Sequence, residues 1–333
     1  MTAAIIPAVA GRYHQNLMNS VTFPYGNQRT FTISDVAENK LRIAMLESGW
    51  MMSGITLMDV DTEKGQAIEI GDSSLHTGRA IEGRFNKGLA VNGTDYFLVE
   101  TDSCASLSYE KMSAIANVGG MEHFAQRVDE FFGMAVSLDM LRIGLNGERI
   151  AYPTDPESNT KGQDVNIGWH AIAKTFNNGS QVITEAVTLG EGGDFPHLDA
   201  LANHLITTNI PEGFREDPRL VVMVGAELAA AERLRLFNAA DRPADTAAAQ
   251  MLTSSVAGRF AFVPPFMPGK RLAITTLDNL HIYTQKGSRH FRAEFVDDRA
   301  VYEQGYWRNE GYALGNGFLY TAVDEKAITF ARK

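Results

Sequence analysis

The sequence predicts an α+β fold, and three observations support this. An apolar pattern with helical spacing runs unbroken from Met121 to Asn146, strand-forming runs flank a long polar excursion between Gly54 and Thr101, and further strand-forming runs occupy the end of the chain. With 333 residues, the chain is long enough for one large domain or two ordinary ones. A hydrophobic content of 44% and a charged content of 21% are typical of a protein that buries a core.

The N-terminal region predicts an extended arm followed by a helix. Residues 1 to about 30 are punctuated by Pro, Gly and Asn, whereas 32–48 carries an approximate apolar stripe. Arg12 and Arg29 both precede Asp35, the first acidic residue. The arm is therefore mildly basic in a chain whose net charge is −10.

The next region predicts strands around an excursion. Strand-forming runs occur at Ile55–Val60, Ala67–Ile70 and Asp95–Thr101. Between them, Gly71–Gly93 is polar and glycine-rich, with no helical period. Because a compact domain seldom contains so long a structureless stretch unless it is functional, we expect this excursion to have a role.

Met121–Asn146 is the longest predicted helix, and it would extend roughly 39 Å before Gly147 ends it. Apolar residues at alternating three- and four-residue spacing predict one buried face. The predicted stripe consists of Phe124, Val128, Phe131, Ala135, Leu138, Leu141 and Leu145.

Helices and strands alternate farther along. A short helix is predicted after Asp164, and Asp194 with Pro196 predicts the start of another. Leu220–Val224 reads as a buried strand, and Gly225 leads into an Ala-rich helix. Four residues of the second helix share an apolar face: Leu198, Leu201, Leu205 and Ile206. Three late strands are predicted at Leu272–Thr276, Leu280–Thr284 and Gly317–Val323.

Charge and cysteine content exclude several classes of protein. A net charge of −10 argues against tight binding of nucleic acid over the whole surface, which needs clustered Lys and Arg. The single cysteine, Cys104, excludes an intramolecular disulfide and predicts a small half-buried thiol in a strand. The start of the chain lacks the basic n-region of a signal peptide, and no apolar run approaches the roughly 20 residues of a membrane span. We therefore expect no membrane partner.

Motifs for catalysis are weak. The chain has no P-loop, no H-E-x-x-H and no G-x-S-x-G, and Phe195 stands where a dinucleotide fingerprint needs its third glycine. His197 and His204 could share a helix face and hold a metal, although a surface histidine pair is far commoner. Trp169 and Trp307 are interpreted as packing anchors. We expect no enzyme, metal or cofactor, with a soluble α/β hydrolase or transferase as the alternative.

A series of blocks resembles the major capsid protein of tailed phages of the peduovirus (phage P2) type, in that family's order and near its spacing. The blocks are Gln163–Trp169, Leu189–Phe195, Leu198–Leu201, Glu216–Gly225, Val263–Pro268 and Leu277–Tyr283. Weaker similarity extends from about residue 28 to 325. The extreme N-terminus departs from the family, as do the short C-terminus and Gly258–Ala261.

The resemblance implies an HK97-like (Hong Kong 97-like) capsid fold. Its implied parts are an N-terminal arm at 1–53, an extended E-loop at 54–105, a peripheral (P) domain at 106–189 with its spine helix at 121–146, an axial (A) domain at 190–275, and a return to the P domain at 276–333. In this arrangement the polar excursion, which cannot bury itself, lies over a neighbouring subunit.

The implied function is a shell subunit that forms hexamers and pentamers of an icosahedral phage head around double-stranded DNA. It implies assembly in the host cytoplasm, location in the virion capsid, and no cofactor. The implied partners are further copies of the chain, a scaffolding protein with protease activity, a portal, optionally a decoration protein, and DNA through weak non-specific contacts. An encapsulin-like compartment is the alternative with the same fold. The residues expected at subunit contacts are Arg79, Arg84, Lys87, Arg233, Arg235 and Arg242.

Overall fold

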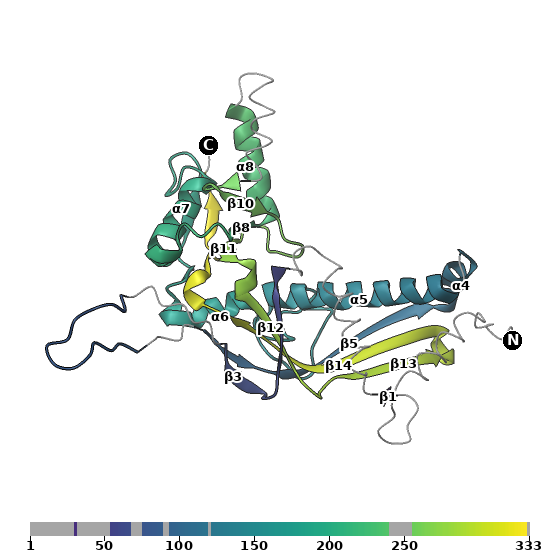
Figure 1. Cartoon of the computed structure of the whole chain (residues 1–333). Helices are drawn as coiled ribbons and strands as arrows, with labels where there is room; N and C mark the ends of the chain where they lie inside the picture. The colour runs from purple at the N-terminus through teal and green to yellow at the C-terminus, as the bar shows by residue number, and fades with distance from the viewer. Residues whose placement is uncertain are drawn as a thin grey trace. The chain divides into compact units, whose positions relative to one another are not determined.

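The computed structural model describes residues 30–31, 54–67, 75–88, 93–118, 121–239 and 255–331 (Figure 1). The predicted arm at 1–29, the predicted helix at 32–48 and Arg242 lie outside this range. The chain forms two compact units. Unit 1 comprises Met1–Glu63, Phe97–Leu141 and Tyr283–Gly311, and unit 2 comprises Lys64–Tyr96, Arg142–Ile282 and Tyr312–Lys333. Of the helices described, none combines the length and apolarity needed to cross a membrane.

A six-stranded sheet runs through unit 1. Its strands follow the order β1-β13-β14-β12-β2, with β5 also paired to β14, and both β5 and β13 are antiparallel to β14. The bounds are β1 Thr30–Phe31, β2 Thr56–Val60, β5 Val99–Ser108, β12 Leu280–Gln285, β13 His290–Val296 and β14 Val301–Leu314. Strands β2 and β12 confirm the predicted runs, and the predicted strand Asp95–Thr101 is divided between β4 (Asp95–Phe97) and β5. Strands β13 and β14 were not predicted.

The long helix α5 spans Met121–Asn146, as predicted, and follows the shorter helix α4 (Tyr109–Val118). The predicted buried face is partly wrong. Phe131 is 50% exposed, whereas its neighbour Phe132 is 2% exposed. The buried apolar side chains of the helix within unit 1 include Val128, Phe132, Val136, Met140 and Leu141. Leu138 is half-buried, and the side chain of Phe124 lies outside the described set.

Phe132 packs edge-on against Phe291 of β13, with ring centroids 5.5 Å apart. The predicted stripe is therefore correct at Val128, Leu141 and Leu145, whereas Phe132 and not Phe131 provides the buried aromatic ring. Because Phe131 and Phe132 are adjacent, the sequence is compatible with two different buried faces of the helix. Only packing against the sheet decides which face is buried.

A small two-stranded sheet flanks the excursion. Strand β3 (Lys64–Gln66) pairs with β4 (Asp95–Phe97). Of the strand predicted at Ala67–Ile70, Ala67 alone lies within the described residues, and it is in neither strand. Ala67 is buried outside the ladder, and its N–H donates to the Thr94 carbonyl at 2.9 Å. Residues 75–88 form the loop in Figure 1 that carries neither helix nor strand.

A second six-stranded sheet forms the centre of unit 2, in the order β6-β15-β11-β8-β10-β9. Strand β8 is parallel to β10 and antiparallel to β11. The bounds are β6 Val182–Ile183, β8 Leu220–Val224, β9 Ser255–Val256, β10 Arg259–Phe262, β11 Leu272–Thr276 and β15 Thr321–Val323. A separate two-stranded sheet pairs β7 (Val187–Leu189) with β16 (Ile328–Phe330). The strands predicted at β8 and β11 are confirmed, whereas the predicted strand Gly317–Val323 begins as a 3₁₀ turn over Gly317–Leu319.

The helices described in unit 2 beyond the end of α5 are α6 (Trp169–Thr175), α7 (Leu198–Asn209) and α8 (Ala226–Ala239). The predicted apolar face of α7 is confirmed, because all four of its residues are buried in one core cluster with strand β8. The predicted start is wrong. His197 caps the helix, its Nδ1 accepting the Ala200 N–H at 3.1 Å, whereas Asp194 accepts the Thr188 N–H.

Gly225 marks the tight junction between β8 and α8, as predicted. A Cβ added there would lie 2.2 Å from the Pro268 carbonyl oxygen and 2.3 Å from that of Gly269. Its N–H donates to the Arg271 carbonyl at 2.8 Å. The backbone of the neighbouring loop therefore needs a residue without a side chain here.

Candidate assembly surfaces

The described part of the excursion, 75–88, exposes most of its side chains. The three basic residues predicted at subunit contacts are exposed: Arg79, Arg84 and Lys87. The side chain of Ile81 is fully exposed to solvent. The Lys87 ammonium donates to the Leu75 carbonyl at 3.3 Å, which brings the two ends of the segment together. Three basic residues therefore lie on a loop that has no core of its own.

Helix α8 carries the second group of predicted contact residues. Arg233 is exposed, whereas Arg235 donates from Nε to Glu232 Oε1 at 3.1 Å. This hydrogen bond raises the pKa of Arg235. The guanidinium of Arg235 is therefore already held within the chain, so Arg233 is the better candidate for meeting a neighbour.

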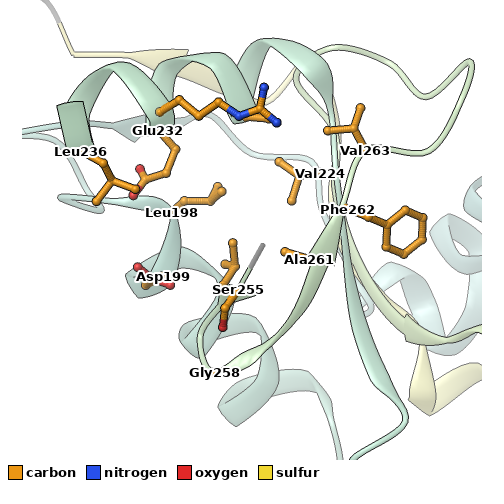
Figure 2. Close-up of a pocket in the computed structure, with 13 residues that line it drawn as sticks. Leu198, Asp199, Val224, Glu232, Leu236, Ser255, Gly258, Ala261, Phe262 and Val263 are labelled. Carbon is orange, nitrogen blue, oxygen red and sulfur yellow. The ribbon is translucent and has the colours of Figure 1, made fainter. Parts of the chain in front are cut away.

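A hollow of about 430 Å³ lies beside α8 in unit 2 (Figure 2). Leu198 and Val224 point toward its centre, and Asp199, Glu232 and Arg233 are among its charged lining residues. Asp199 is occupied, because its Oδ1 accepts the Ala257 N–H at 2.6 Å. An apolar floor with a charged rim is typical of a protein contact.

A buried charged cluster ties α6 to the C-terminal region of unit 2. His170 Nε2 lies 3.3 Å from Asp324 Oδ2, and its Nδ1 lies 3.2 Å from the Tyr320 hydroxyl. Lys174 also contacts Asp324, and Arg271 Nε donates to Glu325 at 2.9 Å. Sequence reasoning missed this cluster because its members are far apart in the chain.

In the part of the chain that the structure describes, the single group with metal-binding geometry is His170, Asp324 and Glu325. Lys174 and Arg271 already neutralise its two carboxylates, so the cluster is better suited to holding the fold than to holding an ion. The pair considered from the sequence is not brought together as a site, because His197 caps α7 and the ring of His204 packs on Phe195.

The environment of His170 predicts a loss of stability in acid. Burial lowers its pKa from 6.5 to about 4, and hydrogen bonding to His170 and Lys174 lowers the pKa of Asp324. His170 therefore binds a proton more readily in the unfolded chain than in the folded one. Its contribution to stability is fully present above pH 6.5 and is lost as the pH falls toward 4. We expect a loss on the order of 2–3 kcal/mol across this window.

Urea unfolding near neutrality and at about pH 5 measures this loss. In His170→Gln the pH slope should shrink but not vanish, because burial also lowers the pKa of His281. An unchanged slope would show that His170 is protonated as easily in the native state as in the unfolded chain.

Three single residues complete the comparison with the sequence. Trp169 is a packing anchor as predicted: it is 1% exposed, its Nε1 donates to the His281 carbonyl at 3.0 Å, and its ring lies edge-on to Tyr312. Trp307 remains partly exposed. Cys104 lies in strand β5 as predicted, but it is exposed and not half-buried.

Comparison with known proteins decides the family. A family model described as phage major capsid protein, P2 family, matches residues 11–326. The chain belongs to this family. It is therefore a structural subunit of a phage shell and not an enzyme, which removes the hydrolase or transferase alternative. The P2-family capsid chain is a component of the virion, and its shell is built from copies of itself.

Individual relatives agree with this assignment. The capsid proteins of Escherichia phage P2 are 26% identical over 272 residues, which covers 77% of this chain and 75% of that protein. The major capsid protein of Serratia phage KSP20 is 23% identical over 280 residues, covering 77% and 78%. A solved procapsid of satellite phage P4, which includes the size determination protein Sid, matches with a TM-score of 0.77 and 22% identity over 98% of this chain and 99% of that one. The predicted HK97-like capsid fold is confirmed.

Proposed function

We propose that this capsid subunit assembles into hexamers and pentamers that close an icosahedral head around double-stranded DNA. The observation that carries the proposal is the match of a P2-family capsid model along residues 11–326. The exposed segment 75–88 supports it, because the apolar side chains that it exposes are available for burial against another copy.

Within this proposal the parts of the chain take the roles of the HK97-like fold. Residues 1–53 form the arm, 54–105 the E-loop, 106–189 the P domain with α5 as its spine, 190–275 the A domain, and 276–333 the return to the P domain. The A domain, with α8 and the following segment that contains Arg242, lies at the centre of each ring of subunits.

The proposed partners are a scaffolding protein with protease activity, a portal and optionally a decoration protein. DNA would contact the shell weakly and without sequence preference. The net charge of −10 is consistent with this, since a container must not bind its contents tightly at every subunit. The mildly basic arm is the segment that would meet scaffold before packaging and DNA afterwards.

Co-expression with the scaffolding protein, followed by size-exclusion chromatography with light scattering, tests the function. A shell subunit gives particles in the megadalton range. A small, stable oligomer that persists with scaffold present would contradict the proposal.

The placement of α8 gives a separate prediction. Arg233→Glu should lower the yield of shells several-fold, because the exposed guanidinium would be replaced by a charge that repels a neighbour's carboxylate. Arg233→Lys keeps the positive charge and should assemble nearly normally. Shell yields from sucrose-gradient sedimentation provide the measurement, and equal yields from both variants would remove Arg233 from the contact.

A further inference from the structure

The loop between α5 and α6 encloses a buried carboxylate. Asp164 is 2% exposed. Its Oδ2 accepts the Asp155 N–H at 2.6 Å and a hydrogen bond from Asn159 Nδ2 at 3.1 Å. The main-chain carbonyl of Asp164 also accepts the Ala151 N–H at 2.9 Å. These contacts fix the carboxylate against the turn at 155–159.

The other oxygen of this carboxylate, Oδ1, is buried and has no hydrogen-bond donor among the residues that the structure describes. Neither of the basic residues of the loop, Arg149 and Lys161, donates to it. A buried ionised carboxylate costs free energy unless donors or a cation stabilise its oxygens. An oxygen of this kind therefore marks the position of a bound cation or a bound water.

The surrounding loop favours a cation, because it is acidic and rich in oxygen ligands. Residues 153–166 contain three acidic residues and a single basic one: Asp155, Glu157, Asp164 and Lys161. The amide nitrogen of Asn159 donates to the Asp155 carbonyl at 3.1 Å and to Asp164, so its amide oxygen is the atom left to bind a cation. Glu157 is exposed, so core packing does not restrain its carboxylate.

The chemistry of these ligands selects calcium. Residues 148–168 contain neither His nor Cys, which zinc prefers, and their carboxylate, amide and main-chain oxygens match a hard cation. Ca²⁺ accepts six to eight oxygens in irregular geometry, whereas Mg²⁺ demands a regular octahedron and keeps several waters.

The sequence agrees in part. Asp155, Glu157 and Asn159 stand at alternate positions, as at the start of an EF-hand calcium loop, although Thr160 replaces the glycine of that motif. The loop combines one buried carboxylate with amide and main-chain oxygens, so it is a different kind of site from the three-residue group around His170.

We propose that the loop 153–166 binds one Ca²⁺ per subunit. Asp164 Oδ1 anchors the ion, and the Asn159 amide oxygen, the Glu157 carboxylate, main-chain carbonyls and water complete its shell. Because an ion that binds the folded chain and not the unfolded one stabilises the fold, Ca²⁺ holds the loop between α5 and α6 in place. The site belongs to the single subunit, so its test does not depend on the formation of shells.

Calorimetry of the unassembled subunit tests the site. The protein is freed of metal with EGTA, and its melting temperature is compared in EGTA, in millimolar CaCl₂ and in millimolar MgCl₂. Ca²⁺ should raise the melting temperature by about 3 °C or more, and Mg²⁺ should raise it by less than half as much. Isothermal titration with Ca²⁺ should give one site per chain. No shift with Ca²⁺, or a larger shift with Mg²⁺, would overturn the proposal.

Variants locate the ion within the chain. Asp164→Asn keeps the size of the side chain and removes its charge, so it should lose the Ca²⁺ shift. Its melting temperature in EGTA should equal or exceed that of the parent, because the buried charge is gone. Glu191→Gln removes an exposed carboxylate outside the loop and is the matched control, which should keep the full shift. Equal shifts in Asp164→Asn and the parent, or a lost shift in Glu191→Gln, would refute the assignment.

A second variant keeps the test valid if Asp164→Asn does not fold. The exposed side chain of Glu157 contributes nothing to the core, so Glu157→Gln should fold normally. Its Ca²⁺ affinity in isothermal titration should fall about tenfold or more, because a charged ligand is lost. An unchanged affinity would overturn the assigned ligand set.

Discussion

Phe132→Ala should destabilise the folded chain by about 3–5 kcal/mol, the range for removing a buried aromatic side chain. Phe132 is 2% exposed and packs edge-on against Phe291, so its removal leaves a cavity between α5 and the sheet. Phe131→Ala is the matched control. Its side chain is 50% exposed, and the expected loss is about 1 kcal/mol or less.

Denaturant unfolding followed by circular dichroism compares the two variants with the parent chain. The midpoint of the Phe132 variant should shift far more than that of the Phe131 variant, with unchanged slope. A larger effect at Phe131 would mean that α5 is rotated about its axis relative to the packing described above.

Replacing 76–86 by a short Gly/Ser linker should abolish shells and leave the fold nearly unchanged. The segment contributes exposed side chains and no buried core, so little folding energy is lost with it. The linker can join the cut ends, because Lys87 reaches the Leu75 carbonyl across the base of the loop. Sedimentation measures assembly, and thermal unfolding of the unassembled subunit measures the fold.

The control keeps the loop and changes only its sequence at the tip. Gly83→Asn leaves the length unchanged, and Asn tolerates the positive φ of 72° at this position. It should assemble. Normal shells from the linker variant would show that the excursion is dispensable, and a strongly lowered melting temperature would show that it belongs to a core.

The elements that sequence reasoning predicted are those with a strong local signal. Helix α5 has an uninterrupted apolar pattern and a glycine at its end, and strand β8 is a continuous apolar run between turn residues. Helix α7 was predicted with the correct buried face because its leucines recur at helical spacing. In each case the residues themselves specify the element before any tertiary contact forms.

The longest strand that was missed, β14, buries polar residues. Strand β14 places Glu303, Gln304, Arg308 and Glu310 in the interior, so its sequence lacks the apolar pattern of a strand. These side chains are stabilised by partners on other strands, as when Arg308 donates to Ser103 of β5. Such pairing depends on the register of the sheet, which local sequence does not contain.

Some of the candidate contact surfaces could be predicted from the sequence, and others could not. The basic excursion could be located from its composition, because exposed glycine-rich loops with Arg and Lys have an evident signature. The residues that line the hollow beside α8 could not be grouped from the sequence, since only the packing of α7, α8 and β10 brings them together. The buried cluster around His170 required the same kind of long-range information.

Electron cryomicroscopy of shells assembled with the scaffolding protein tests the central claim most directly. We expect closed icosahedral particles in which the A domain at 190–275 surrounds each local five- or sixfold axis, with residues 238–248 nearest that axis and 75–88 lying on a neighbouring copy. Particles that lack icosahedral order, or a map in which 75–88 contacts only its own chain, would contradict the account.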